Sequence, residues 1–254
     1  MEYHPVTNPD GKYKAAQLVR ACWALRDMCL AYDLPLLSGK DSMYVDGLLP
    51  GAFGEMHRVS GLPTLFFTAV SVLDDLRLAL TLDLKTPGDL IYLLGETKPE
   101  LGGSEFYELL GYVGLSVPQV RPQEFLSYYR LVEEAIKGAL LSSCHGVYRG
   151  GLLVHLALIS LASGLGLDAD LSRIAPGLPV HAALYAESAG RFLISTPPGH
   201  RQKLEDLLQG QPLYFLGEVR PDGKFHLRRE GQTLIKAPVN KLQQTWQRRF
   251  GNLI

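Results

Sequence analysis

Residues 38–42 read Ser-Gly-Lys-Asp-Ser and follow a short apolar stretch, so several side chains that bind anions or metal ions stand together. A glycine lets backbone N–H groups approach an anion closely, and a lysine neutralises phosphate charge. An aspartate binds metal ions, and a serine hydroxyl forms hydrogen bonds with either kind of ligand. The spacing is not that of a Walker A loop. Two interpretations remain open: a solvated polar turn, or a ligand-binding loop made by Gly39, Lys40, Asp41 and Ser42.

A second group of polar residues precedes two helices that the sequence predicts. Gly102, Gly103 and Ser104 come directly before one helix, whose free N–H groups could bind phosphate. The simpler interpretation is that the Ser104 hydroxyl caps its own helix. Arg149 precedes two glycines at the start of the other helix, where its charge could hold an anion. The candidate anion-binding residues are therefore Gly102, Gly103, Ser104, Arg149, Gly150 and Gly151.

Cys144 and His145 are neighbours, and such a pair raises the question of nucleophilic catalysis. Neighbouring residues of a strand point to opposite faces, so these two side chains cannot form a thiolate–imidazole pair. His155 lies in an apolar helical segment and is predicted to be a hydrogen-bonded core histidine. Asp74 and Asp75 are expected to have structural or solvent-facing roles. The sequence thus predicts no catalytic residue and leaves any metal ligand unknown.

The helices and strands around these residues must position them. Apolar residues at three- and four-residue steps predict a helix over residues 12–32. Apolar composition predicts a short buried strand over 35–40, a strong strand over 64–76 and a second strand over 78–84. Residues 46–63 are rich in glycine and proline, which indicates a long loop or a hairpin.

The rest of the chain alternates between strand-like and helix-like segments. Strands are predicted over residues 89–96, 190–197 and, with a Pro-Asp-Gly turn, 213–235. Helices are predicted over residues 102–111, 124–141, 151–164, 199–210 and 238–250. The mixture indicates an α+β fold with helices packed on one side of the sheet. Pro87-Gly88-Asp89 punctuates the chain and predicts a domain boundary between residues 86 and 87.

The composition excludes several classes of function. The 254 residues include 25 basic and 26 acidic side chains, a net charge of −1, which offers no basis for binding nucleic acid or an anionic membrane. No apolar run is long enough to span a bilayer, and the polar N-terminus does not resemble a signal peptide, so a cytoplasmic location is expected. Three cysteines do not suggest a disulfide framework, and Cys22 and Cys29 are expected to be small buried side chains.

A series of segments resembles one enzyme family in the same order along the chain. The segments are "AAQLVRACWALRDMCLAYDLPLLSGKDSM", "SGLPTLFFTAVSVLDD", "PGDLIYLLGE", "LGGSEFYELLG", "CHGVYRGGLLVHLALISLASGLGLDADLS", "LYAESAGRFLIS", "FLGEVRPDGKFHL" and "LQQTWQRRF". They resemble the phosphoribosylformylglycinamidine synthase family, also called formylglycinamide ribonucleotide amidotransferase, within the aminoimidazole ribonucleotide synthase-like superfamily. Each segment alone is a modest match, but the series covers nearly the whole chain.

The resemblance implies a fold and a reaction. Residues 1–86 would be part of an N-terminal-type α/β half that carries ATP and substrate residues, and 87–254 a complete C-terminal-type α+β domain. In this family ATP phosphorylates the amide oxygen of formylglycinamide ribonucleotide, and ammonia from glutamine displaces the phosphate to give the amidine. Magnesium would shield the phosphates, so ATP and magnesium are the implied cofactors of this purine-biosynthetic ligase.

The resemblance also implies roles within residues 39–42. Gly39 would touch nucleotide, and Lys40 would stand where some members place an asparagine that binds magnesium. Ser42 would contact the substrate ribonucleotide. Large single-chain members also carry Lys-Asp-Ser-Met here, so Lys40 and Asp41 are compatible with a working loop.

A second loop departs from the family pattern. Members usually read His-Asp-x-Ser-Asp-Gly-Gly, whereas this chain reads His-Gly-Val-Tyr-Arg-Gly-Gly from residue 145. Gly146 replaces the acid that would bind magnesium, Tyr148 replaces the serine, and Arg149 replaces the second acid. These changes put a metal–nucleotide site at this loop in doubt. The family's site there is auxiliary, so its loss need not abolish the reaction.

The resemblance further implies that other polypeptide must complete the site. The main ATP-binding residues of the upstream synthetase half and the glutaminase nucleophile have no counterpart in this sequence. We therefore expect an excised C-terminal segment or a separately encoded subunit, inactive alone, whose partners are the upstream half and a glutaminase subunit or domain. A second copy of the chain is a further candidate partner. The alternatives are a non-catalytic assembly module and an enzyme resembling selenophosphate synthetase or the hydrogenase maturation factor.

Overall fold

The computed structural model describes residues 11–40, 46–60 and 64–248. The chain divides into two compact units, Met1–Val72 and Leu73–Ile254. The domain boundary predicted between residues 86 and 87 stays a prediction. Among the described residues, no helix combines the length and the apolar character that crossing a membrane requires.

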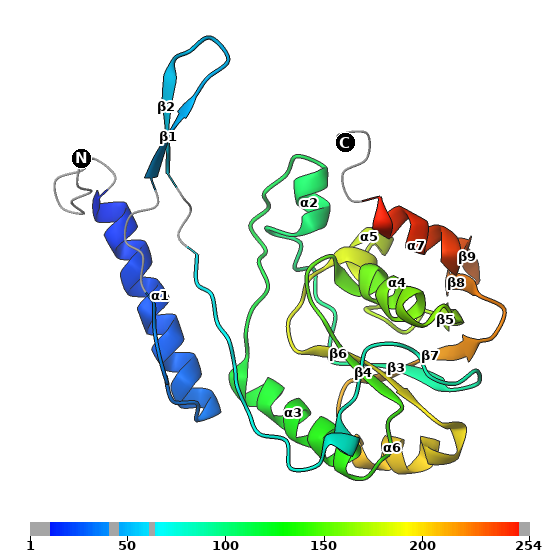
Figure 1. The fold of residues 1–254 in the computed structure, drawn as a ribbon. Helices are drawn as coiled ribbons and strands as arrows, with labels where there is room; N and C mark the ends of the chain where they lie inside the picture. The colour runs from blue at the N-terminus through cyan, green and yellow to red at the C-terminus, as the bar shows by residue number, and fades with distance from the viewer. Residues whose placement is uncertain (1–10, 41–45, 61–63, 249–254) are drawn as a thin grey trace. The chain divides into compact units, whose positions relative to one another are not determined.

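The first unit contains a helix and a hairpin (Figure 1). The helix α1 spans Gly11–Tyr32, as its apolar spacing predicts, and ends at Asp33, whose φ is 52°. The strands β1 (Asp46–Pro50) and β2 (Met56–Ser60) pair antiparallel. The hairpin interpretation of this glycine-rich region is therefore confirmed.

Other predictions for this part of the chain are wrong. The described residues of 35–40 and 64–84 contain no strand, and a short 3₁₀ turn, η1 (Leu76–Leu78), lies where strand was expected. Phe66 and Val70 expose 93% and 79% of their surface. Strand-forming residues need a neighbouring strand to take their backbone hydrogen bonds, and no such ladder forms here among the described residues. Cys22 is also exposed, contrary to the expectation of burial.

The second unit is built on a seven-stranded sheet. Its strand order is β4-β6-β3-β7-β5-β8-β9, and every pair is antiparallel except β5 with β8. The strands are β3 (Leu90–Leu94), β4 (Ser143–Val147), β5 (Gly166–Asp170), β6 (Arg191–Thr196), β7 (Leu213–Arg220), β8 (Lys224–Arg229) and β9 (Gln232–Pro238).

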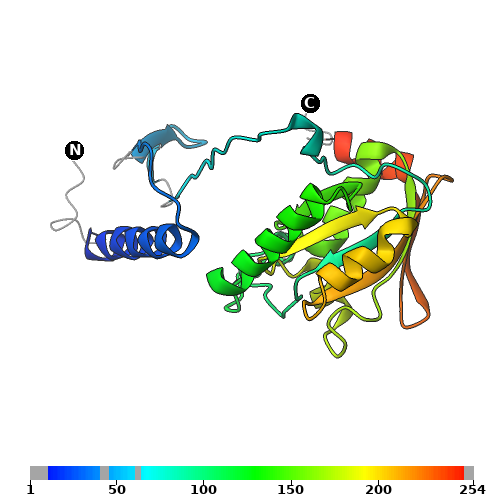
Figure 2. The same cartoon turned by 90° about the horizontal axis from the view of Figure 1, so that it is seen from below.

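Helices cover both faces of this sheet. In Figure 1, α4 (Gly151–Ser163), α5 (Val180–Tyr185) and α7 (Val239–Gln247) lie above β3, β4, β6 and β7. The helices α3 (Pro122–Lys137) and α6 (Arg201–Leu207), with the short turn η2 (Pro198–His200), lie on the other face, which Figure 2 shows from below. A further short helix, α2 (Glu105–Leu109), follows β3.

The central strand β3 shows why two layers of helix are needed. Ile91 and Leu93 pack into the core beneath α4, whereas Tyr92 and Leu94 pack against α3 and α6. A strand that is apolar on both faces must be covered on both. The α+β class is confirmed, but the expectation of helices on one side only is wrong for this reason.

One glycine, Gly217, allows β7 to approach β5 closely within the sheet. A Cβ atom at Gly217 would lie 1.9 Å from the carbonyl oxygen of Asp168, because β7 and β5 approach closely at this point. No other residue type fits such an approach. The register of β7 against β3 also shifts between Ile91 and Tyr92, opposite this region.

Candidate functional site

Three loops of the second unit meet at the carboxylate of Glu187. Its Oε1 atom accepts a hydrogen bond from the N–H of Glu105, at 2.9 Å, and from that of Gly150, at 2.8 Å. Arg149 forms an ion pair with the carboxylate of Glu105. The structure thus brings together the starts of α2 and α4, which carry the two groups of candidate anion-binding residues.

Ser104 caps α2, as the simpler interpretation predicts. Its Oγ atom accepts from the N–H of Tyr107 at 3.2 Å and donates to the carbonyl oxygen of Leu101 at 2.6 Å. The side chain is fully buried. A buried hydroxyl with both partners present is a stable N-cap.

The two glycines before Ser104 use their N–H groups within their own loop. Gly102 donates to the carbonyl oxygen of Ser116 at 2.8 Å, and Gly103 donates to that of Val113 at 2.7 Å. These bonds tie the start of α2 to the segment that follows it. Anion binding by Gly102, Gly103 and Ser104 stays a prediction.

The glycine pair at the start of α4 is required by packing. Gly150 and Gly151 have φ values of 89° and 72°, which favour glycine. A Cβ atom at Gly151 would lie 2.6 Å from the backbone of Tyr185, so α4 and α5 touch here. The N–H group of the neighbouring Gly150 donates to Glu187 at the same helix start.

Behind the loop from β4 to α4 lies a pair of histidines. Nε2 of His145 is 2.8 Å from Nδ1 of His155, and the N–H of Tyr148 donates to Nε2 of His155 at 3.1 Å. The carbonyl oxygen of Arg149 is also 3.1 Å from that Nε2 atom. If Nε2 of His155 accepts from Tyr148, its Nδ1 atom carries the proton and donates to Nε2 of His145; if Nε2 carries the proton, it donates to the carbonyl oxygen of Arg149 instead.

Burial explains the electrostatics of this pair. Desolvation lowers the pKa of His145, and it lowers the pKa of His155 to about 4, with His145 itself adding to the effect. The prediction that His155 is a hydrogen-bonded core histidine is confirmed.

Cys144 and His145 face opposite sides of the sheet, as expected for neighbours on a strand. Cys144 packs with the core beneath α3 and α6, whereas His145 contacts α4. Burial raises the pKa of the Cys144 thiol to about 11, which disfavours the thiolate. The geometry therefore holds these two groups apart.

A buried arginine fixes the loop that carries Glu187. The guanidinium of Arg191 donates to the carbonyl oxygens of Ala186, at 2.7 Å, and Ser188, at 2.8 Å. It also donates to Oγ1 of Thr97 at 3.0 Å. Burial lowers the pKa of Arg191 to about 10, so the side chain is still charged at neutral pH. Sequence reasoning missed both Glu187 and Arg191, although two charged residues inside the mostly apolar segment 184–194 were a signal.

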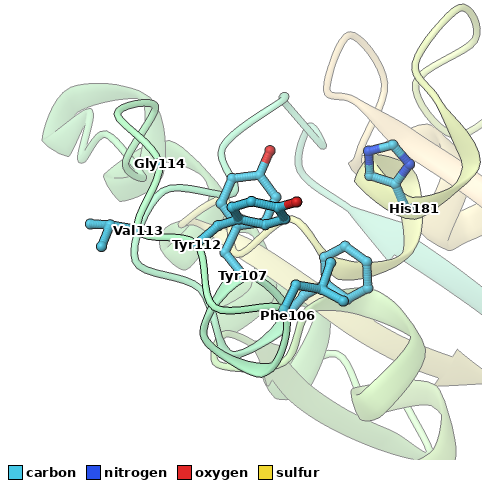
Figure 3. A pocket seen from close by; sticks show the side chains of 7 residues that line it. Phe106, Tyr107, Tyr112, Val113, Gly114 and His181 are labelled. Carbon is cyan, nitrogen blue, oxygen red and sulfur yellow. The ribbon is translucent and has the colours of Figure 1, made fainter.

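An apolar pocket of about 530 Å³ lies beside α2 (Figure 3). The ring of Phe106 stacks on that of Tyr185, with centroids 4.5 Å apart, and Tyr107 meets Tyr112 edge to face. The lining residues are Phe106, Tyr107, Leu110, Tyr112, Val113, Gly114 and His181. Sequence reasoning did not predict this pocket, because its walls come from two separate segments.

The other predicted loop lies in the first unit. Gly39 and Lys40 are exposed there, and Asp41 and Ser42 lie outside the described residues. Binding of substrate or nucleotide by Gly39, Lys40, Asp41 and Ser42 therefore stays a prediction.

Metal-binding geometry is missing from the part of the chain that the structure describes, which holds no group of three His, Cys, Asp or Glu side chains placed to share an ion. Asp75 instead caps η1 and pairs with Arg77 at 2.7 Å, and these hydrogen bonds lower the pKa of its carboxyl. The structural role predicted for Asp75 is confirmed. The β4–α4 loop, Tyr148-Arg149-Gly150, carries no acidic side chain and does not fit magnesium.

The fold is similar to solved structures from Thermotoga maritima. PurL complexed with FGAR shares 15% identity at a TM-score of 0.63, covering 85% of this chain and 36% of that one. Phosphoribosylformylglycinamidine synthase II shares 17% identity at a TM-score of 0.57, and the match covers 66% of this chain and 28% of that one. PurLQS shares 17% identity at a TM-score of 0.55, and the match covers 66% of this chain and 28% of that one. The chain thus spans about a third of the length of these proteins, and at such identities the likeness concerns the fold.

A sequence match identifies the family. Residues 86–230, more than half of the chain, match the family described as "AIR synthase related protein, C-terminal domain". The matched range contains Ser104, Arg149, Gly150 and Glu187. The resemblance to the aminoimidazole ribonucleotide synthase-like superfamily is confirmed, and this chain belongs to the AIR synthase related protein family through its C-terminal domain.

Proposed function

We propose that this chain is the C-terminal segment or a subunit of an ATP-dependent C–N ligase, the synthetase that converts formylglycinamide ribonucleotide to formylglycinamidine ribonucleotide in purine biosynthesis. The observation that carries the proposal is the extent of the fold match. The match to PurL complexed with FGAR covers 85% of the chain. Residues 86–254 make up a smaller share of the chain than this, so the match extends into the segment before residue 86. The ordered sequence segments support the same assignment.

The proposed reaction transfers the γ-phosphoryl group of ATP to the amide oxygen, which turns that oxygen into a leaving group. Ammonia then attacks the carbon, and phosphate departs. Within this chain, Gly39, Lys40, Asp41 and Ser42 are proposed to contact nucleotide and substrate. ATP and magnesium would be held mainly by the completing polypeptide, because the β4–α4 loop does not fit the metal.

The surface of the first unit supports a completing partner. Its exposed large apolar side chains include Trp23 on α1 and, on the segment that follows the hairpin, Phe66, Phe67, Val70 and Val72. An apolar surface of this kind marks a site where another polypeptide packs. The proposed partners are the upstream synthetase half and a glutaminase subunit or domain, with a second copy of the chain as a further candidate.

A second candidate function is a non-catalytic assembly module that kept the fold. The observation that favours it is the β4–α4 loop, where Arg149 pairs with Glu105 and the N–H of Gly150 binds Glu187. The groups that would hold a nucleotide at this loop are thus engaged within the chain.

Turnover assays separate the candidates. The purified chain with ATP, magnesium, formylglycinamide ribonucleotide and ammonia is expected to form no amidine, and addition of the upstream half is expected to restore the reaction. Lys40→Ala and Ser42→Ala should weaken substrate and nucleotide binding by the complex, measured by calorimetry. Lys241→Ala, which removes an exposed lysine from α7, is the matched control. Robust turnover by the chain alone would contradict its incompleteness, and a complex that binds neither ligand would favour the assembly module.

A further inference from the structure

The carboxylate of Glu187 occupies the point where the starts of two helices meet. One oxygen atom, Oε1, accepts from the N–H groups of Glu105 and Gly150, at 2.9 and 2.8 Å. Two backbone N–H groups that converge on one oxygen form the arrangement by which proteins hold anionic ligands. Here the oxygen belongs to the chain itself.

The loop behind Glu187 holds the carboxylate in this position. The N–H of Glu187 donates to the carbonyl oxygen of Glu100 at 3.1 Å. The guanidinium of Arg191 is hydrogen-bonded to the carbonyl oxygens of the residues on either side, Ala186 and Ser188. Arg191 is buried, so this support is rigid and shielded from water. The position of the carboxylate is therefore built into the fold.

The charges around the carboxylate oppose a further anion. Arg149 supplies positive charge, but it is paired with the carboxylate of Glu105. Glu105, Glu187 and Arg149 together carry two negative charges and one positive charge, and the positive charge of Arg191 is buried behind Glu187, hydrogen-bonded to Ala186, Ser188 and Thr97. A phosphate group at the start of α4 would have to displace Glu187 from both N–H groups and approach two carboxylates.

We propose that Glu187 is a resident anion, which joins the starts of α2 and α4 and excludes phosphate from the β4–α4 loop. Glu187 is thus a positioning residue for this loop. The inference goes beyond the proposed ligase reaction, which assigns no step to the loop.

Backbone amide NMR tests the proposal directly. In the wild-type protein, the amide signals of Glu105 and Gly150 are expected not to move when inorganic phosphate or magnesium-ATP is added. In Glu187→Ala both signals should shift upfield, because a charge-assisted hydrogen bond is lost. Glu187→Gln keeps a neutral oxygen in the same place and should give a smaller shift.

Chemical rescue provides a second readout. Glu187→Ala should melt several degrees lower than wild type, and formate, a small carboxylate, should restore part of that loss. Sodium chloride at the same ionic strength should not. Glu133→Ala, which removes an exposed carboxylate from α3, is the matched control and should show no response to formate.

Two results would overturn the proposal. One is a saturable shift of the wild-type Glu105 and Gly150 signals with phosphate or magnesium-ATP. The other is a Glu187→Ala protein whose two amide signals are unchanged. If Glu187→Ala does not fold, Glu187→Gln provides the same amide comparison. The ligase proposal is tested separately, by turnover of the completed complex. If that proposal fails, the results expected for the amide signals of Glu105 and Gly150 do not change.

Discussion

Nδ1 of His155 lies 2.8 Å from Nε2 of His145, in the buried space between β4 and α4. The hydrogen bond links a strand of the sheet to the helix that follows it. The other ring nitrogen of His155, Nε2, contacts the backbone of Tyr148 and Arg149 in the β4–α4 loop. The pair of histidines thus supports the β4–α4 loop from behind through these hydrogen bonds.

This pair predicts a loss of stability in acid. The pKa of His155 is about 4 in the folded protein and about 6.5 when unfolded, so the unfolded chain binds more protons between these values. The free energy of unfolding should therefore fall as the pH drops from about 6.5 to about 4, by at most about 3 kcal/mol from this group. Urea titrations at several pH values measure the slope.

His155→Gln serves as the diagnostic variant, because it removes the titrating group and keeps hydrogen-bonding atoms. The pH dependence of its unfolding free energy should be flatter than that of wild type across the same window. His181→Gln, at an exposed position, should keep the wild-type slope. An unchanged slope in His155→Gln would show that other groups cause the acid sensitivity.

Gly151→Ala should destabilise the protein by more than about 2 kcal/mol. The added Cβ would lie 2.6 Å from the backbone of Tyr185, and the φ of 72° is itself unfavourable for alanine. Gly199→Ala is the control, since a Cβ there meets nothing within 4 Å, and its cost should stay below about 0.5 kcal/mol. Equal losses in denaturant titrations would contradict the close contact of α4 with α5.

Replacing Arg191 with methionine should cost about 3 kcal/mol or more. The change leaves the carbonyl oxygens of Ala186 and Ser188 without their buried donor. Arg173→Met, which removes an exposed arginine of the same unit, should change stability by less than about 0.5 kcal/mol. The prediction fails if thermal unfolding shifts by the same amount in both variants.

Serine substitutions at Phe66 and Val70 should weaken binding of the completing synthetase half at least tenfold without changing the melting of the second unit. The two side chains are 93% and 79% exposed and lie on an apolar segment. Leu109→Ser, an equally exposed change on α2, is the control. Sedimentation or calorimetry of the mixed chains measures the effect, and unaltered affinity would place the interface elsewhere.

Local sequence patterns predicted the elements whose signals are strong over several turns or residues. Six helices, α1, α2, α3, α4, α6 and α7, and the strands β3, β6, β7, β8 and β9 correspond to predicted segments. The strand β5 was missed, because its sequence Gly-Leu-Asp-Ala-Asp has low strand propensity. It forms a strand because β7 and β8 provide hydrogen-bonding partners on both sides.

The opposite error occurred over residues 64–76. Their composition is that of a strand, but composition cannot supply a partner, and the described backbone there forms no ladder. Similarly, the Ser104 cap was predictable because its partner is three residues away. The role of Glu187 was not predictable, because its carboxylate accepts hydrogen bonds from N–H groups 37 and 82 residues away in sequence.

The sequence by itself determined the family resemblance, the α+β class, the cap at Ser104 and the core role of His155. These depend on residue type and on spacing within a few turns of chain. Only the tertiary structure decided that helices cover both faces of the sheet, and that a carboxylate of the chain fills the start of α4. The reason is physical: burial of both faces of β3 and the convergence of N–H groups on Glu187 are set by contacts between segments far apart in sequence.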